Sequence, residues 1–133
     1  MEFNIRQLNP SDYEDVLVGW WKDWGWEAPA KDFLPENGEG GLMVLDNDKP
    51  VCAGFLYISN SKVAWVEWII SDKNYKEKRT EALNLLLEGL ILTSKNLKMK
   101  YIFATNNNQH LIKKFLDLGF KKGSTTTELI KII

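Results

Sequence analysis

The apolar segment 64–70 contains one ionisable side chain, Glu67. Trp65 and Trp68 lie on either side of it in the sequence, and their rings would exclude water from the carboxylate. A carboxylate in apolar surroundings is a candidate general base, the group that removes a proton from a nucleophile. The alternative interpretation is a structural glutamate on the outer face of a half-buried strand, and the sequence leaves both open.

Positive charge gathers a few residues further along the chain. Lys73, Lys76, Lys78 and Arg79 precede a segment in which leucines recur at helical spacing, so a helix begins close to these cations. Cations oppose the dipole at a helix N-terminus, whereas phosphate groups bind there. This placement therefore indicates a site for a phosphate-bearing cofactor. A solvated helix start without a ligand is the alternative interpretation.

The formal net charge of −1 at pH 7 conceals an asymmetry along the chain. Residues 1–48 contain 11 acidic and 3 basic side chains, and residues 49–133 contain 7 acidic and 14 basic ones. A polyphosphate cofactor on the basic part and an amine substrate near the acidic part would fit this distribution. Solvated faces without partners would fit it equally well. We expect no nucleic-acid partner.

The length is that of one domain, so residues 1–133 are expected to fold as a single unit. The one cysteine, Cys52, excludes an internal disulfide, points to a reducing compartment, and is expected to be buried rather than nucleophilic. The sequence has no run of about eighteen apolar residues and no signal-peptide pattern at its start, so we expect a cytoplasmic protein with no membrane partner. Besides Cys52, the one histidine, His110, is a candidate metal ligand, but we expect it to be solvated. We therefore expect no metal site.

Alternating apolar residues predict a strand at 3–8, and apolar segments separated by turns predict strands at 42–45, 51–58 and 63–70, the last three forming an antiparallel meander. A capping box at Ser11 and Glu14 predicts the start of a helix that runs to about Trp24. The connector after this helix is rich in glycine and proline and has room for one short helix.

The apolar period changes to 3.6 residues after Asp72, which predicts a long helix. Residues 100–105 then return as a strand in a parallel, right-handed crossover. A shorter helix begins near Asn108 and ends at Gly119, and residues 126–132 are expected to close the sheet. The expected fold is α/β (α+β), with a mixed, mostly antiparallel sheet of six to seven strands flanked by about four helices.

The segment from Asn108 to Phe120 has the pattern Asn-x-x-Leu-x-x-x-Phe-x-x-Leu-Gly-Phe. With the strand, turn and helix at 65–90, it resembles the GNAT superfamily of N-acetyltransferases, in which the corresponding segment is Asn-x-x-Ala-x-x-x-Tyr-x-x-x-Gly-Phe. The order of elements extends the resemblance over nearly the whole chain, and the motif match covers about residues 65–122. The resemblance implies an acyl-CoA N-acyltransferase-like fold and acetyl-CoA as co-substrate.

Two positions depart from the family pattern. In the turn that holds pyrophosphate, Lys78 and Thr80 stand where the family usually has glycine or alanine, and Tyr75 stands where it has Arg or Gln. Phe115 stands where family members often have the tyrosine that protonates the leaving thiolate. Tyr75, Tyr101 or water are the remaining candidates for that acid.

The resemblance implies direct transfer of an acetyl group to an amine, with Glu67 as the general base. It implies two groups of residues for acetyl-CoA. The first group lies along the pantetheine arm: Ile69, Ile70, Ser71, Asn108 and Phe115. The second surrounds the pyrophosphate: Lys76, Glu77, Lys78, Arg79 and Thr80.

The family also implies an acceptor site, here at Trp24, Trp26 and Glu27. Tryptophans at helical spacing, here Trp20, Trp21 and Trp24, are usually core, which is the alternative interpretation for Trp24. The acceptor would be a small-molecule amine or a peptide or protein amine, and the protein a monomer or homodimer. The alternatives are a catalytically inactive GNAT-like module that binds CoA or a protein partner, and an aromatic-rich interaction domain that shares only the topology.

Overall fold

The computed structural model describes residues 2–133, and in these residues five strands form one sheet. The strands are β1 (Phe3–Gln7), β2 (Gly41–Asp46), β3 (Lys49–Ile58), β4 (Val63–Ser71) and β5 (Tyr101–Ala104). The α-helices are α1 (Val18–Asp23), α2 (Arg79–Asn96) and α3 (Gln109–Asp117). A π-helix, Tyr13–Leu17, leads directly into α1, and two 3₁₀ helices, Lys31–Phe33 and Pro35–Gly38, lie before β2.

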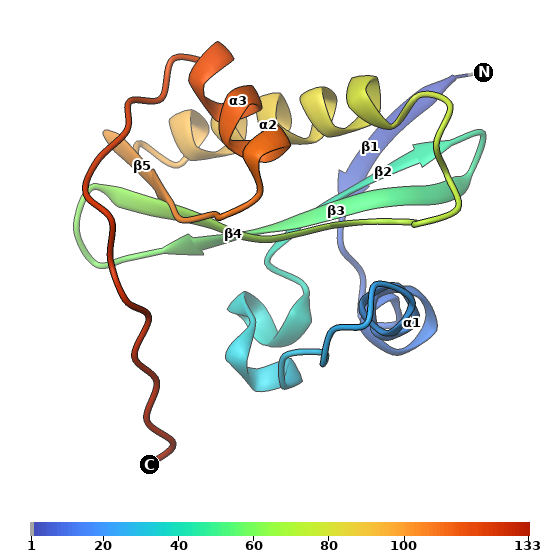
Figure 1. Ribbon diagram of the computed structural model, residues 1–133, viewed down its shortest axis with the longest axis horizontal. Coiled ribbons are helices and arrows are strands. Elements are labelled where there is room, and N and C mark those ends of the chain that lie inside the picture. Colours follow the sequence, from blue (N-terminus) through green and yellow to red (C-terminus); the bar gives the residue numbers. More distant parts are fainter. Residues whose placement is uncertain (1) are drawn as a thin grey trace.

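The sheet order follows the sequence, β1-β2-β3-β4-β5, with antiparallel pairs except for the parallel pair β4–β5. Asn47 and Asp48 have φ angles of 47° and 72°, the left-handed conformation that a two-residue turn between β2 and β3 requires. The parallel pair follows from the strand, helix, strand unit β4-α2-β5, as predicted. Figure 1 shows α2 and α3 on one face of the sheet and α1 with the 3₁₀ helices on the other.

Apolar side chains fill both faces of the central strand β3. Val51, Cys52 and Leu56 lie in the core under α2 and α3, and Ala53 and Phe55 lie in a second core under α1. Cys52 is fully buried, and this burial raises the pKa of its thiol to about 12. The thiol therefore stays protonated, which confirms the prediction of a core cysteine.

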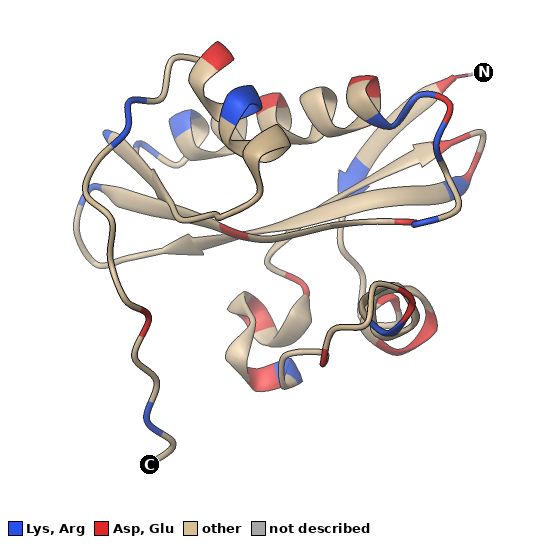
Figure 2. Cartoon of the chain, viewed as in Figure 1, with Lys and Arg blue, Asp and Glu red and all other residues tan. Residues whose placement is uncertain are grey.

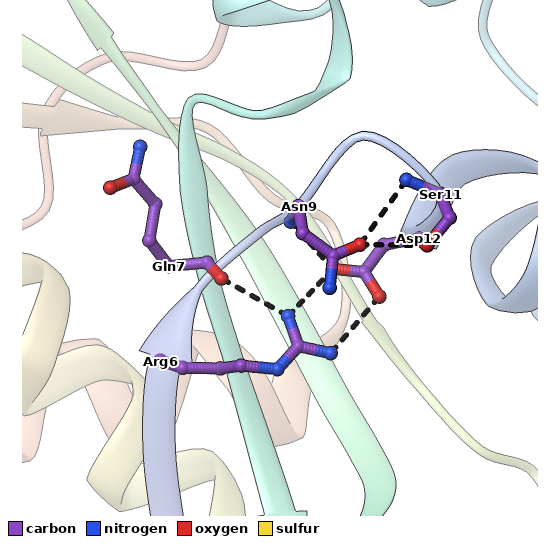
Figure 3. A network of polar contacts seen from close by, with 5 residues as sticks. All are labelled: Arg6, Gln7, Asn9, Ser11 and Asp12. Atoms are coloured by element: carbon purple, nitrogen blue, oxygen red, sulfur yellow. Dashed lines mark hydrogen bonds and ion pairs between the residues drawn. The ribbon is translucent and has the colours of Figure 1, made fainter.

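The predicted capping box at the start of the first helix is wrong. Asp12, the residue before the π-helix, already has helical backbone angles, and its side chain makes no cap. Instead its carboxylate accepts two hydrogen bonds from Arg6, at 2.8 and 3.1 Å, and one from the Asn9 amide at 2.8 Å (Figure 3). Glu14 pairs with Lys31 at 3.0 Å. An ion pair with β1 thus replaces the local cap, and sequence spacing cannot reveal a contact of this kind.

The predicted closing strand at 126–132 is also wrong, because residues 118–133 contain no helix or strand. Gly119, with a φ of 96°, ends α3 as expected, and the chain then runs past the sheet without pairing (Figure 1). Within residues 2–133 the sheet therefore has five strands rather than six to seven, and three α-helices rather than about four flank it. The difference arises because a strand forms only where it has a partner.

None of the helices in residues 2–133 is both long and apolar enough to cross a membrane.

Candidate active site

A bulge in β4 lies beside Glu67. Phe55 of β3 pairs with Glu67 and Ala53 pairs with Ile70, so β4 has one more residue than β3 between these pairs. Trp68, in the bulge, has a φ of 59°, which a bulky side chain adopts only when its surroundings enforce it. Its indole Nε1 donates to the Tyr57 hydroxyl at 2.9 Å, and its ring packs edge-on against Trp21. The bulge changes the direction of β4 at the residue that carries the candidate base.

The parallel strands β4 and β5 separate at the same place. Their pairing runs from Val63 with Tyr101 to Val66 with Ala104 and ends there, although β4 continues to Ser71. Within residues 2–133 no strand pairs with the β5 side of β4 beyond Val66. The backbone of Glu67 to Ser71 therefore has no strand partner on this side, here called the opening, where an extended ligand could add to the sheet. One carbonyl there is engaged, because Trp24 Nε1 donates to the Ser71 oxygen at 2.8 Å.

Glu67 spans this opening through a single carboxylate oxygen. Oε1 accepts hydrogen bonds from the Thr105 amide at 3.0 Å, the Thr105 hydroxyl at 2.7 Å and Trp65 Nε1 at 3.1 Å. Three donors fix the position of the carboxylate. Within the described chain no hydrogen bond reaches the other oxygen, Oε2, so it is available to a ligand.

Thr105 is a site residue that the sequence did not single out. The register of the parallel pair, Val63 with Tyr101, places Thr105 opposite Glu67. The available signal was that Glu67 and Thr105 are polar residues at corresponding places in two consecutive parallel strands. Their contact could not be predicted, because the sequence does not give the register of the strand pair.

Exposed aromatic rings surround Glu67. Trp65 lies against Phe103 with ring centroids 4.3 Å apart, and both rings remain partly exposed. Tyr57 pairs with Trp65 across β3 and β4, and its hydroxyl donates to the Phe33 carbonyl at 2.9 Å. Burial and the nearby Glu67 charge raise the pKa of Tyr57 above its usual value, so this hydroxyl stays protonated. The surroundings of Glu67 therefore combine two partly exposed aromatic rings, Trp65 and Phe103, with the protonated hydroxyl of Tyr57.

The cations after β4 divide into two groups. Arg79 donates to the carbonyls of Tyr75, Asp72 and Lys73 at 3.0, 3.2 and 2.8 Å, and its guanidinium lies 5.5 Å from the centre of the Trp24 ring. Lys73 also lies over Trp24, at 5.5 Å. These two residues hold the loop against α1. Figure 2 shows the positive charge of this loop close to the start of α2.

The second group lies at the N-terminus of α2. Lys78 precedes the helix with a φ of −126° and makes only an exposed ion pair with Glu81 at 3.4 Å. Lys76 is exposed. None of residues 72–80 has a positive φ, so the loop forms without the glycines that the family pattern would place there. Lys78 is half-buried, and the exposed side chains of this loop are those of Lys73, Asn74, Lys76, Glu77 and Thr80.

Asn108 and Phe115 have structural roles. Asn108 Oδ1 accepts from the Leu111 amide at 3.1 Å and caps α3. Phe115 is 7% exposed and packs edge-on against Phe120 at 4.9 Å. A contact of either residue with CoA stays a prediction.

The predicted acceptor residues lie near the cationic loop. Trp24 stacks on Trp26 with ring centroids 5.7 Å apart, and Trp26 is exposed. Among the described residues no hydrogen bond or ring contact joins Trp24, Trp26 or Glu27 to Glu67. Trp20 and Trp21 are buried in the core under α1, as predicted.

Comparison of the sequence with protein-family models and with curated proteins finds no match. Comparison with solved structures finds many. Glucosamine-6-phosphate N-acetyltransferase from Arabidopsis thaliana superposes with a TM-score of 0.71 at 12% identity, over 98% of this chain and 99% of that one. The ribosomal-protein-S18-alanine N-acetyltransferase from Escherichia coli gives 0.71 at 17% identity, over 92% and 80%.

A third similar structure, AAC(6')-Iy in complex with a bisubstrate analogue of CoA, gives a TM-score of 0.71 at 14% identity and covers all of both chains. All three are acetyltransferases by name or ligand. This chain has the fold of these acetyltransferases, which confirms the predicted acyltransferase-like fold, although the sheet in residues 2–133 has five strands rather than six to seven. Identities this low establish the fold alone.

Proposed function

We propose that this protein is an acetyl-CoA-dependent N-acetyltransferase that transfers the acetyl group directly to an amine, with Glu67 as the general base. The observation that carries the proposal is the Glu67 carboxylate, fixed by Thr105 where β4 and β5 separate and left with Oε2 unoccupied. The superposition on acetyltransferases supports it, because three of the similar structures share this fold over most of the chain.

The reaction begins with loss of a proton. An ammonium has no lone pair, so it must give a proton to a base before its nitrogen can attack the thioester carbonyl. Glu67 Oε2 is the acceptor of this proton, and the hydrogen bonds to Oε1 keep the carboxylate in place. The nitrogen then bonds to the acetyl carbon and loses its second proton to solvent, the carbon–sulfur bond breaks, and CoA leaves as a thiolate.

The cofactor is assigned to the opening and to the loop beyond it. Backbone groups of Ile69, Ile70 and Ser71 are assigned to the pantetheine arm, and the pyrophosphate to Lys76, Lys78, Thr80 and the first amides of α2. Arg79 is given a supporting role, because its guanidinium is already bonded to three carbonyls of the loop.

No protein acid is assigned to the leaving thiolate. Phe115 has no hydroxyl, and the Tyr75 hydroxyl donates to Asp46 Oδ2 at 2.8 Å. Burial and the contact with Asp46 raise the pKa of Tyr75 to about 12, so its proton is held firmly. A thiol has an ordinary pKa of about 8.5, and its thiolate can leave and take a proton from water.

The buried Phe115 is the observation that favours the second candidate function, a catalytically inactive module that binds CoA. Two experiments distinguish the enzyme from the inactive module. Calorimetric titration measures the binding of acetyl-CoA, and an assay of CoA thiol release with a panel of amines measures turnover. The enzyme binds acetyl-CoA and releases CoA thiol with at least one amine. Ligand at 100 times its dissociation constant should also stabilise the fold by about 2.7 kcal/mol. Binding without thiol release identifies the inactive module, and absence of binding contradicts both.

A further inference from the structure

The side chain of Glu67 projects to the face of the sheet on which α1 lies. Its partner in β3, Phe55, belongs to the core under α1, and paired residues of neighbouring strands point to the same face. Trp65, two residues earlier, shares this face because side chains alternate along a strand. Tyr57 and Phe103 pair with Trp65 from either side. Three aromatic side chains therefore form a row across β3, β4 and β5, next to Glu67.

A fourth ring comes from the 3₁₀ helix Lys31–Phe33. Phe33 packs edge-on against Trp68 with ring centroids 5.9 Å apart, and Figure 1 shows this helix on the same face of the sheet as α1. We call these four rings the aromatic surface: Phe33, Tyr57, Trp65 and Phe103. Tyr57 is half-buried, whereas Phe33, Trp65 and Phe103 are 48%, 39% and 48% exposed. Exposed rings gathered at one place mark a surface that binds a ligand.

The polar atoms of the aromatic surface are already paired within the protein. Trp65 Nε1 donates to Glu67 Oε1 at 3.1 Å. The Tyr57 hydroxyl accepts from Trp68 Nε1 and donates to the Phe33 carbonyl, each at 2.9 Å. A ligand therefore meets the faces and edges of rings here rather than free donors.

One open acceptor atom borders the aromatic surface, and it is Oε2 of Glu67. The three hydrogen bonds to this carboxylate all reach Oε1. A carboxylate oxygen beside exposed rings is complementary to an ammonium that carries an apolar body, because the charge binds the nitrogen and the rings bind the body. The hydroxyl groups of a sugar would lose water on these rings without gaining partners. The contacts thus favour one class of amine.

We propose that the acceptor is a primary amine joined by a short carbon chain to an aromatic ring, with its ammonium on Glu67 Oε2 and its ring on the aromatic surface. This inference rests on the proposed function, because it names the substrate class of the same site. The chain is short because Trp65 bonds to the carboxylate itself, so the rings begin beside the amine. The acceptor ring packs offset or edge-on against Trp65 and Phe103, as aromatic pairs prefer. Trp24 and Trp26, where the family implied an acceptor site, are not part of this surface.

Matched amines test the substrate class in the assay of thiol release. Phenethylamine and ethanolamine carry the same short primary amine but end in a ring and in a hydroxyl, and glucosamine is hydroxylated throughout. We expect kcat/KM for phenethylamine to exceed that for each of the others about tenfold or more, because only its ring gains apolar and aromatic contacts. An equal or higher kcat/KM for ethanolamine or glucosamine overturns the inference and leaves the proposed function standing.

Removal of single rings tests the binding surface. Phe103→Ala should raise KM for phenethylamine about tenfold, with little change in kcat or in KM for acetyl-CoA, because the ring contributes to binding alone. Phe33→Ala, in a different element, should have the same effect and gives a second test if the first variant folds poorly. Leu92→Ala is the control, since Leu92 is exposed on α2 at the opposite face of the sheet, and it should match the parent.

Two results separate a failure of this inference from a failure of the proposed function. An unchanged KM for phenethylamine in both Phe103→Ala and Phe33→Ala overturns the inference, while continued thiol release leaves the acetyltransferase standing. Absence of thiol release with every amine contradicts the proposed function, and the inference falls with it.

Discussion

At the scale of single residues, the Thr105 hydroxyl makes the shortest of the three hydrogen bonds to Glu67, at 2.7 Å. Thr105→Val keeps the branched shape and removes this donor. Loss of one hydrogen bond to a charged group corresponds to about 1.5 kcal/mol, so we expect kcat to fall about tenfold with little change in the affinity for acetyl-CoA. Steady-state kinetics measure both.

Thr93→Val is the matched control, because the Thr93 hydroxyl bonds only to the Gly89 carbonyl of its own helix, at 2.9 Å. We expect its kcat to equal that of the parent. Equal losses in the two variants would mean that Thr105 acts through stability and not through Glu67.

Asp12 and Arg6 make the stability of the fold depend on pH. Burial opposes ionisation of Asp12, but the hydrogen bonds from Arg6 and the Asn9 amide, with the Arg6 charge, outweigh it and lower the pKa of this carboxyl. Their contribution is fully present above the unfolded pKa of about 3.9 and is lost as the pH falls through the lower folded value.

We therefore expect Asp12→Asn to lower the free energy of unfolding by about 1–3 kcal/mol at pH 7, with a smaller difference from the parent near pH 2. Urea titrations at several pH values measure this difference. Glu14→Gln, at an exposed ion pair, serves as the control and should change little. A difference between Asp12→Asn and the parent that is the same at all pH values would contradict this assignment.

The variant Phe115→Tyr tests whether the ring of Phe115 has a packing role or a catalytic one. Its ring is buried against Phe120, so the hydroxyl of Phe115→Tyr would be desolvated without a partner, at a cost of about 1–3 kcal/mol. We expect a lower melting temperature and no gain in rate. A faster reaction at unchanged melting temperature would instead place this ring beside the thioester sulfur.

At the scale of elements, the loop between β4 and α2 is held at one end and open at the other. Arg79 and Lys73 fasten it to Trp24, whereas Lys78 at the start of α2 makes an exposed ion pair. Lys78→Glu should raise the dissociation constant for acetyl-CoA about tenfold, because it places an anion where the pyrophosphate is proposed to bind. Lys98→Glu, beyond the far end of α2, should leave it unchanged in the same titration. Equal effects would show that only the net charge matters.

The elements were predictable to different degrees. Alternating apolar residues predicted β1, short apolar segments between turns predicted β2, β3 and β4, the return of the chain after the long helix predicted β5, and leucine spacing predicted α2. Residues 126–132 have the same kind of pattern but no strand beside them, and a pattern does not supply a partner. The capping box at Ser11 and Glu14 failed because the long-range pair of Arg6 with Asp12 fixes the helix start instead.

At the scale of the whole molecule, the candidate site depends on register. Glu67 was predictable as an isolated carboxylate, but its contact with Thr105 requires the parallel pairing of β4 and β5 and their separation after Val66. The bulge at Trp68 is equally non-local, since Tyr57 and Trp21 hold that ring. These features arise from contacts between distant segments, which no local pattern encodes.

The most direct test of Glu67 as the base compares Glu67→Gln with the parent protein, using the amine that gives the fastest thiol release. We expect kcat to fall by a factor of about 10² to 10⁴, because the amide cannot accept the proton, while acetyl-CoA affinity changes little. Glu88→Gln, at an exposed position of α2, should match the parent. Turnover in Glu67→Gln equal to that of the parent would contradict the proposed mechanism.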